Sequence, residues 1–129
     1  MVRRVCVFYS QNKSLIAELN RARIEDIFFQ AMKENHGKVV DTVIQKKTTK
    51  TIFEDGSELF IAPFGTDVFG LRFTEIYIDN EVKKIENYKD IIDESYSVTV
   101  KRDNILMFSN KFHSLDIWRY SNEDDDHRL

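Results

Sequence analysis

The chain of 129 residues contains only one cysteine, one proline and four glycines. A single cysteine, Cys6, excludes a disulfide within the chain, and no Cys and His residues have the spacing of a zinc site. Because Cys6 lies in an apolar stretch, we expect a buried thiol in a reducing compartment. No run of about 18 apolar residues occurs and the first residues lack the apolar region of a secretory signal. We therefore expect a cytoplasmic protein with no membrane association.

Basic residues are not in excess, since 19 Lys and Arg stand against 22 Asp and Glu, for a formal net charge of −3. Such a balance argues against nucleic-acid binding by the charge of the whole domain. One dense basic run remains, residues 45–50, in which Lys46, Lys47 and Lys50 are candidate contacts to DNA or RNA. The alternative is a solvent-exposed edge strand protected by its lysines.

Hydrophobic residues make up 42% of the chain, which is enough for one core, and we expect one α/β domain over residues 1–122. Residues 123–129 are acidic and polar and are predicted to form a disordered tail. Close to the end, Phe112, Trp118 and Tyr120 either pack into the core or bind a protein partner. The second reading follows from the frequency of Trp and Tyr among interface hot spots.

Strand patterns alternate with helix patterns along the chain. β-branched and aromatic residues predict strands over 2–10, 39–44 and 72–79. Between the first two, apolar residues recur every three to five positions from Leu15 to Lys33, which predicts an amphipathic helix that ends near Gly37.

The remaining segments complete a mixed pattern. Asp55-Gly56 lies between two apolar runs and predicts a hairpin over 49–64. A helix is predicted over 81–96, two strands over 97–110, and a strand or helix over 112–120. The order predicts a small layered α/β sandwich with a mixed sheet of about five strands, two main helices and an inserted β-hairpin.

An acidic pair, Asp79 and Glu81, stands at the end of the strand predicted over 72–79. In open α/β sheets ligands bind outside the carboxyl ends of the strands, and carboxylates held there can bind Mg²⁺. Asp79 and Glu81 are therefore candidate catalytic residues, with Asp79 as a magnesium ligand. The alternative is that these acids only mark the start of the next helix, because the first turn of a helix favours Asp, Asn and Glu.

Four short motifs in this order give the chain a wider resemblance: FEDGS (53–57), GLR (70–72), EIYID (75–79) and LMFSN (106–110). The series resembles the ATPase core of viral large terminases, the DNA-packaging motors. In that family a strand and polar turn open a long helix, and a hairpin of the form F-x-x-G-S follows. A G-x-R tripeptide then precedes the Walker B strand, and the coupling motif ends a later strand. The resemblance covers nearly the whole chain.

The resemblance implies roles for individual residues. Asp79 and Glu81 stand where that family has its Mg²⁺-holding and water-activating acids, and Asn110 stands in the coupling motif. Arg72 would lie beside the nucleotide or at a subunit interface. The alternative for Arg72 is an ion pair at a strand edge, with Glu75 or with an acid on a neighbouring strand.

Two departures weaken the catalytic reading. No phosphate-binding G-x-x-x-x-G-K-[ST] motif is present, and the SQNKS run (10–14) lacks the glycines that let a backbone wrap phosphates. We expect that the chain begins after the family's phosphate loop. Asn80 also separates Asp79 from the acid that would normally follow it. Phosphoryl transfer depends on the cradle, its Lys and the metal, so we expect no autonomous ATP hydrolysis.

The interpretation is a terminase-like module of a phage-type DNA-packaging system that binds or regulates without hydrolysis. If the phosphate-loop strand is missing, the sheet should have an open apolar edge in its middle, which favours a homodimer or a larger protein partner. Two alternatives stay open. One is a small virus-encoded inhibitor of a host or defence protein. The other is a metal-dependent nuclease that uses Asp41, Glu54, Asp55, Asp79 or Glu81.

Overall fold

The computed structural model describes residues 1–11, 15–111 and 114–120, with side chains described outside 15–17, 110–111 and 114–116. Its elements are β1 (Arg4–Tyr9), α1 (Leu15–His36), β2 (Val39–Gln45), β3 (Thr48–Phe53), β4 (Glu58–Pro63), β5 (Glu75–Asp79), the 3₁₀ helix η1 (Asn80–Lys84), α2 (Tyr88–Ile91), the π-helical turn η2 (Ile92–Tyr96), the 3₁₀ helix η3 (Arg102–Asn104), β6 (Ile105–Lys111) and β7 (Ser114–Arg119).

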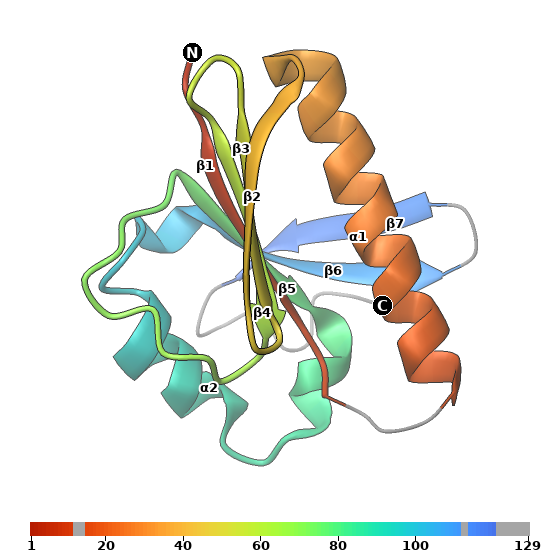
Figure 1. The fold of residues 1–129 in the computed structure, drawn as a ribbon. Coiled ribbons are helices and arrows are strands. Elements are labelled where there is room, and N and C mark those ends of the chain that lie inside the picture. The colour runs from red at the N-terminus through yellow and green to blue at the C-terminus, as the bar shows by residue number, and fades with distance from the viewer. Residues whose placement is uncertain (12–14, 112–113, 121–129) are drawn as a thin grey trace.

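One mixed sheet carries the fold, with the strand order β2-β3-β4-β1-β5-β6-β7 (Figure 1). Strands β4, β1, β5 and β6 run parallel, and the other neighbours are antiparallel. The predicted α/β class with a mixed sheet is confirmed. The hairpin is not an insertion, because β4 pairs directly with β1 and the β2-β3-β4 meander forms three of the seven strands of the sheet.

The central strand is β1, and its residues from Val5 to Tyr9 are all buried. Such a continuous apolar run is typical of a parallel strand that is covered on both faces. β1 pairs with β4 on one side and β5 on the other, so the open edge expected in the middle of the sheet is absent. Among the described strands the two edges are β2 and β7.

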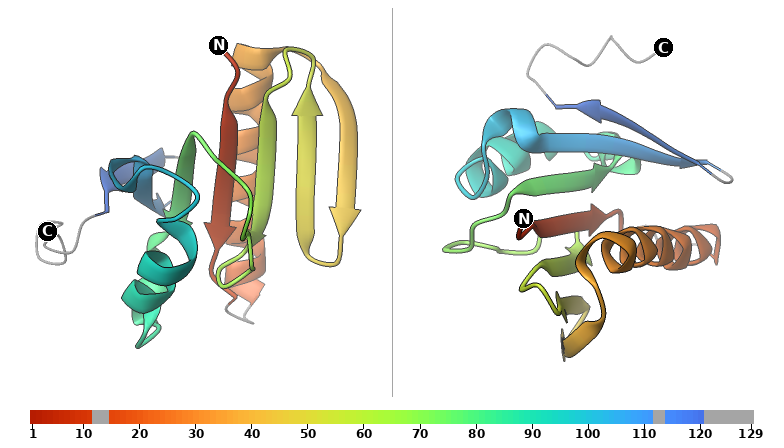
Figure 2. Two further views of the ribbon diagram at one scale, coloured as in Figure 1. Left: turned by 90° about the vertical axis from the view of Figure 1, so that its left-hand side faces the viewer. Right: turned by 90° about the horizontal axis from the view of Figure 1, so that it is seen from above.

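The helices cover opposite faces of this sheet, as the two views of Figure 2 show. On the α1 face, Ile24, Phe28 and Met32 recur every four residues and pack on a core that includes Leu59 and Phe108. On the other face, a second core surrounds residues of η1, α2 and η2. Of the described helices, none is long and apolar enough to cross a membrane.

The predicted end of α1 is confirmed at Gly37. Its φ is +90°, its N–H donates to Lys33 O at 3.2 Å, and a Cβ there would lie 2.4 Å from Glu54 Oε1. Both the backbone conformation and the close approach of Glu54 require glycine.

Two other predictions are wrong. The helix expected over 81–96 breaks at Ile85, whose extended backbone (φ −82°, ψ 127°) separates η1 from α2. The first of the two strands expected over 97–110 is a turn, and only β6 forms.

Candidate functional site

The adjacent carboxyl ends of the parallel strands β1 and β5 form the candidate site. The chain after β1 leads to α1 on one face, and the chain after β5 leads through η1 to α2 on the other. Neighbouring parallel strands whose connections diverge in this way leave a crevice between them, where open α/β sheets bind their ligands. Ser10 directly follows β1 and Asp79 is the last residue of β5, so both lie at this point of the sheet.

Asp79 links the chain after β1 to the start of η1 through backbone hydrogen bonds. Glu81 N donates to its Oδ1 at 3.0 Å, and Ser10 N donates to its Oδ2 at 3.5 Å. The first bond makes Asp79 the N-cap of η1. The residue is 9% exposed, and burial raises the pKa of its carboxyl against the lowering effect of the two hydrogen bonds. The Asp79 carboxylate therefore holds the residue after β1 and the first turn of η1 together, and we call this pair of contacts the clamp.

Glu81 does not join Asp79 in a shared ligand set. Its side chain is half exposed, and its Oε1 lies 2.8 Å from Nζ of Lys84, within the same turn of η1. Only the backbone N–H of Glu81 contacts Asp79. Within the part of the chain that the structure describes, no three His, Cys, Asp or Glu side chains gather in a way that could hold a metal ion.

The carboxylates considered for a nuclease lie apart. Glu54 and Asp55 belong to the turn between β3 and β4, at the end of the sheet opposite Asp79. Asp41 is exposed on the edge strand β2. The structure therefore does not bring these residues together with Asp79 and Glu81.

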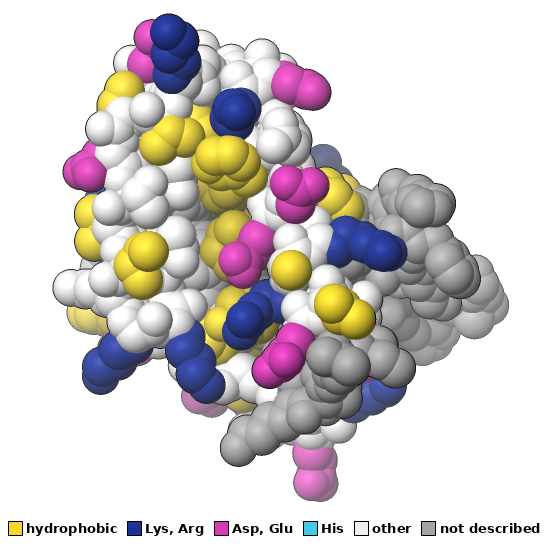
Figure 3. All heavy atoms as spheres, turned by 45° about the vertical axis from the view of Figure 1, so that its right-hand side comes forward, with side chains coloured by type: hydrophobic (Ala, Val, Ile, Leu, Met, Phe, Trp, Pro, Cys, Tyr) yellow, Lys and Arg dark blue, Asp and Glu magenta, His cyan; other side chains and the backbone are white. Residues whose placement is uncertain are grey.

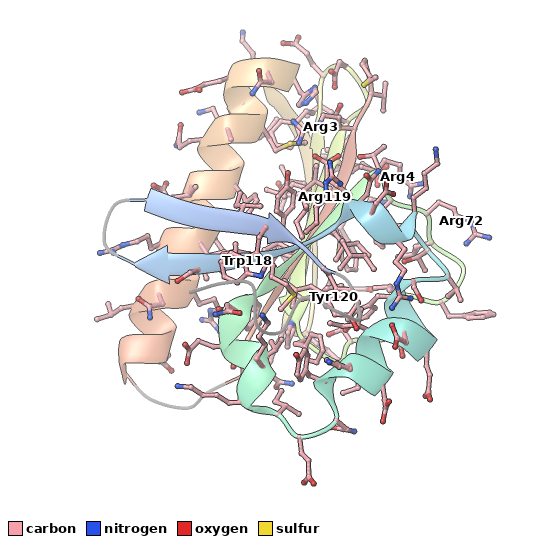
Figure 4. All side chains as sticks on the ribbon, turned by 180° about the vertical axis from the view of Figure 1, so that it is seen from behind. Arg3, Arg4, Arg72, Trp118, Arg119 and Tyr120 are labelled. Carbon is pink, nitrogen blue, oxygen red and sulfur yellow. The ribbon has the colours of Figure 1, made fainter. Side chains whose placement is uncertain are left out.

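Arg72 precedes the amino end of β5, while Asp79 ends that strand, so the strand's whole length separates them. Its Nη1 donates to Leu71 O at 3.0 Å, and Figure 4 shows its side chain pointing away from the sheet. The pairing with Glu75 that we considered does not form, because Glu75 binds Arg3 instead. Arg72 and Asp79 do not share one site in this chain.

The residues expected to bind a partner differ in burial. Tyr120 is 4% exposed and packs in the core on the α2 face. Trp118 is half-buried, with Nζ of Lys83 5.2 Å from the centre of its ring. Both lie at the end of β7 in Figure 4. Phe112 and the side chain of Asn110 fall outside the described residues.

The three candidate lysines divide between two settings. Lys46 and Lys47 form the tight turn between β2 and β3, and Lys46 has a φ of 55°. Lys50 projects from β3, and its Nζ lies 3.8 Å from Glu58 Oε1. Only the turn lysines therefore belong to a groove at the carboxyl end of the parallel strands.

That groove, of about 260 Å³, lies between the β2–β3 turn and α1 and is lined by Tyr9, Arg21, Glu25, Lys46, Lys47, Thr49 and Ile61. Arg21 stacks over the Tyr9 ring at 5.4 Å, and Tyr9 donates a hydrogen bond to Lys47 O at 3.4 Å. Figure 3 shows hydrophobic side chains between the β2–β3 strands and α1, with Lys and Arg side chains gathered at the lower end. We call this site the basic groove.

Sequence reasoning missed a second polar cluster at the opposite end of the sheet. His36 Nδ1 lies 2.7 Å from Asp55 Oδ2 and 3.1 Å from Ser57 Oγ. Both contacts use the same ring nitrogen, and Nε2 is buried with no hydrogen-bond partner among the residues that the structure describes. A Ser-His-Asp relay needs both ring nitrogens, so this cluster does not form a relay. It instead connects the end of α1 to the turn between β3 and β4. The Asp-Gly-Ser turn is the one sequence signal that could have pointed to it.

No family model, curated protein or solved structure matches this chain. The fold and the site therefore rest on the geometry of the chain itself.

Proposed function

We propose that the chain is a terminase-like ATPase-core module that binds or regulates a partner of a DNA-handling system without hydrolysing ATP. One observation carries the proposal. Asp79 ends an inner parallel strand beside the carboxyl end of β1, where a Walker B acid would stand, yet a backbone N–H group donates to each of its oxygens. A carboxylate held in this way stabilises the fold, and one lone pair of each oxygen is already used by a backbone N–H group.

The surroundings of Asp79 support the non-hydrolytic part of the proposal. Phosphoryl transfer requires a backbone cradle, a cation on the phosphates and a bound metal ion. The SQNKS run that follows β1 has no glycine, and Glu81 turns its carboxylate to Lys84. Among the described residues, neither a glycine-rich cradle nor a second carboxylate therefore joins Asp79 at the end of β5.

A phosphate-release assay tests this function. The wild-type chain, Asp79→Ala and Glu81→Gln are each incubated with ATP and Mg²⁺ beside a blank without protein. We expect all three to match the blank. Release above the blank by the wild-type chain that disappears in Asp79→Ala overturns the proposal.

A second candidate function, a small virus-encoded protein that binds a host or defence protein, is favoured by Phe69. This side chain is 84% exposed, and its backbone N–H is capped by Asp67 Oδ1 at 2.9 Å. A large, rigid apolar side chain presented in this way is suited to anchor a protein interface. If this second function is correct, a pull-down with Phe69→Ala should lose a stoichiometric partner protein that a pull-down with Val98→Ala retains. Equal recovery of the partner by both variants contradicts this second function.

A further inference from the structure

The edge strand β2 leaves one row of backbone groups open. It pairs with β3 alone, so the N–H and C=O groups on its other side have no strand neighbour in the described sheet. An open row of this kind is a template for another strand. Figure 2 shows β2 at the free side of the sheet, away from α1.

The side chains of β2 do not protect this edge. Val40, Val43 and Ile44 are 62%, 42% and 70% exposed. Natural edge strands are usually guarded by Lys or Pro within the strand, or by a bulge. Here the bulge lies at the start, between Val39 and Asp41, and the two lysines lie beyond the end. The five residues from Asp41 to Gln45 form a regular ladder with β3 and contain a single charge.

These five residues are complementary to themselves in an antiparallel arrangement. With a two-fold axis at Val43, that residue faces its own copy, Thr42 faces Ile44, and Asp41 faces Gln45. Like charges are not opposed, and each carboxylate meets an amide. A two-fold interface needs this reciprocity, in which each residue meets the same partner in both directions.

We propose that two copies of this chain associate through antiparallel pairing of their β2 strands, centred on Val43, to form one continuous sheet. This inference does not depend on the proposed function. The sequence predicted a homodimer through an open edge in the middle of the sheet. The proposed dimer contact lies instead at the β2 edge.

The helices leave room for this pairing. α1 packs on β3 and β4, so the two paired β2 strands, one from each copy, lie between the two helices in the continuous sheet. A contact of five residues on each side is small beside stable interfaces, which bury about 1,200–2,000 Å² in total. The dimer is therefore weak, and its population rises with protein concentration.

Cysteine crosslinking tests the register. The native Cys6 is completely buried, so it leaves an introduced surface cysteine as the reactive thiol. Directly opposite residues have Cβ atoms about 4.5–5.5 Å apart, whereas diagonal neighbours are about 7–8 Å apart. Val43→Cys should thus give a covalent dimer under mild oxidation. Ile44→Cys, although more exposed, should give far less.

Sedimentation equilibrium is a second test of the proposed dimer. The average mass of the wild-type chain should rise with concentration toward twice the monomer mass, while Val43→Lys stays monomeric because two ammonium groups would face each other. Val98→Lys, an equally charged change at an exposed position outside β2, should behave as the wild type. A wild-type chain that stays monomeric at all concentrations overturns the proposal. So does crosslinking of Ile44→Cys equal to that of Val43→Cys.

Discussion

His36 Nδ1 lies 2.7 Å from Asp55 Oδ2, which ties the last residue of α1 to the turn between β3 and β4. Desolvation opposes ionisation of Asp55, but hydrogen bonds from Ser57 and His36 outweigh it and lower the pKa of this carboxyl to about 2. A carboxyl whose pKa is lower in the folded state stabilises the fold above its unfolded pKa. That contribution is lost as the pH falls from about 4 to about 2.

The first prediction follows from this tie. Asp55→Asn should be less stable than the wild type at pH 5, and the difference in the free energy of unfolding should shrink as the pH is lowered toward 2. Urea titrations at several pH values measure it. The control, Asp26→Asn, removes the same charge from the exposed side of α1. A difference between Asp55→Asn and the wild type that stays constant from pH 5 to 2 contradicts the assigned pKa shift.

The second prediction concerns the two backbone hydrogen bonds that the Asp79 carboxylate accepts. Asp79→Ala removes the N-cap of η1 and the acceptor of the Ser10 N–H, and it should cost about 1–2 kcal/mol of unfolding free energy. Asp79→Asn should cost less, because Asn caps helices nearly as well as Asp. Glu81→Ala serves as the matched control, with a change within about 0.5 kcal/mol, since only the surface pair with Lys84 is lost. Equal losses for Asp79→Ala and Glu81→Ala would refute the clamp.

The third prediction concerns the completely buried Tyr96, which stacks on Phe8 with ring centres 4.1 Å apart. Its hydroxyl accepts a hydrogen bond from Gly65 N at 2.7 Å. Tyr96→Phe keeps the stacking but leaves the Gly65 N–H without this acceptor, and it should cost about 1–3 kcal/mol. Tyr77→Phe should cost less, because Glu75 keeps its bonds to Arg3 and Thr74. Chemical denaturation of both variants checks the order.

The fourth prediction concerns the basic groove. If Lys46 and Lys47 contact the phosphates of duplex DNA, the double Gln variant should lower the slope of log affinity against log salt by about 2. Fluorescence anisotropy with a labelled duplex measures this slope. The double Gln variant of Lys38 and Lys101, two exposed lysines at the other end of the sheet, makes the same charge change. Equal slopes for both double variants show that the groove is not the contact.

Local sequence patterns predicted part of this fold correctly. The apolar run of β1, the periodicity of α1, the glycine after it and the Asp55-Gly56 turn all form as expected, because each depends on neighbours in the chain. The order of the strands was not readable in this way, since β4 reaches β1 only through long-range pairing. Apolar spacing also could not reveal the break at Ile85, which lies between the helical segments η1 and α2.

In the candidate site too, features that depend on chain neighbours were predictable and features that depend on strand pairing were not. The place of Asp79 at the end of a strand followed from the string EIYID, but its bond to Ser10 depends on the pairing of β1 with β5. The separation of Lys50 from the turn lysines required the strand register, which sets the face on which each side chain lies.

The central claim is that the Asp79 carboxylate clamps two backbone N–H groups and does not hold a metal-bound nucleotide. The most direct measurement follows the amide resonances of Ser10 and Glu81 by NMR while Mg²⁺ and ATP are added. We predict that neither resonance shifts in a saturable manner. Saturable shifts of both amides that are absent in Asp79→Ala would contradict the account.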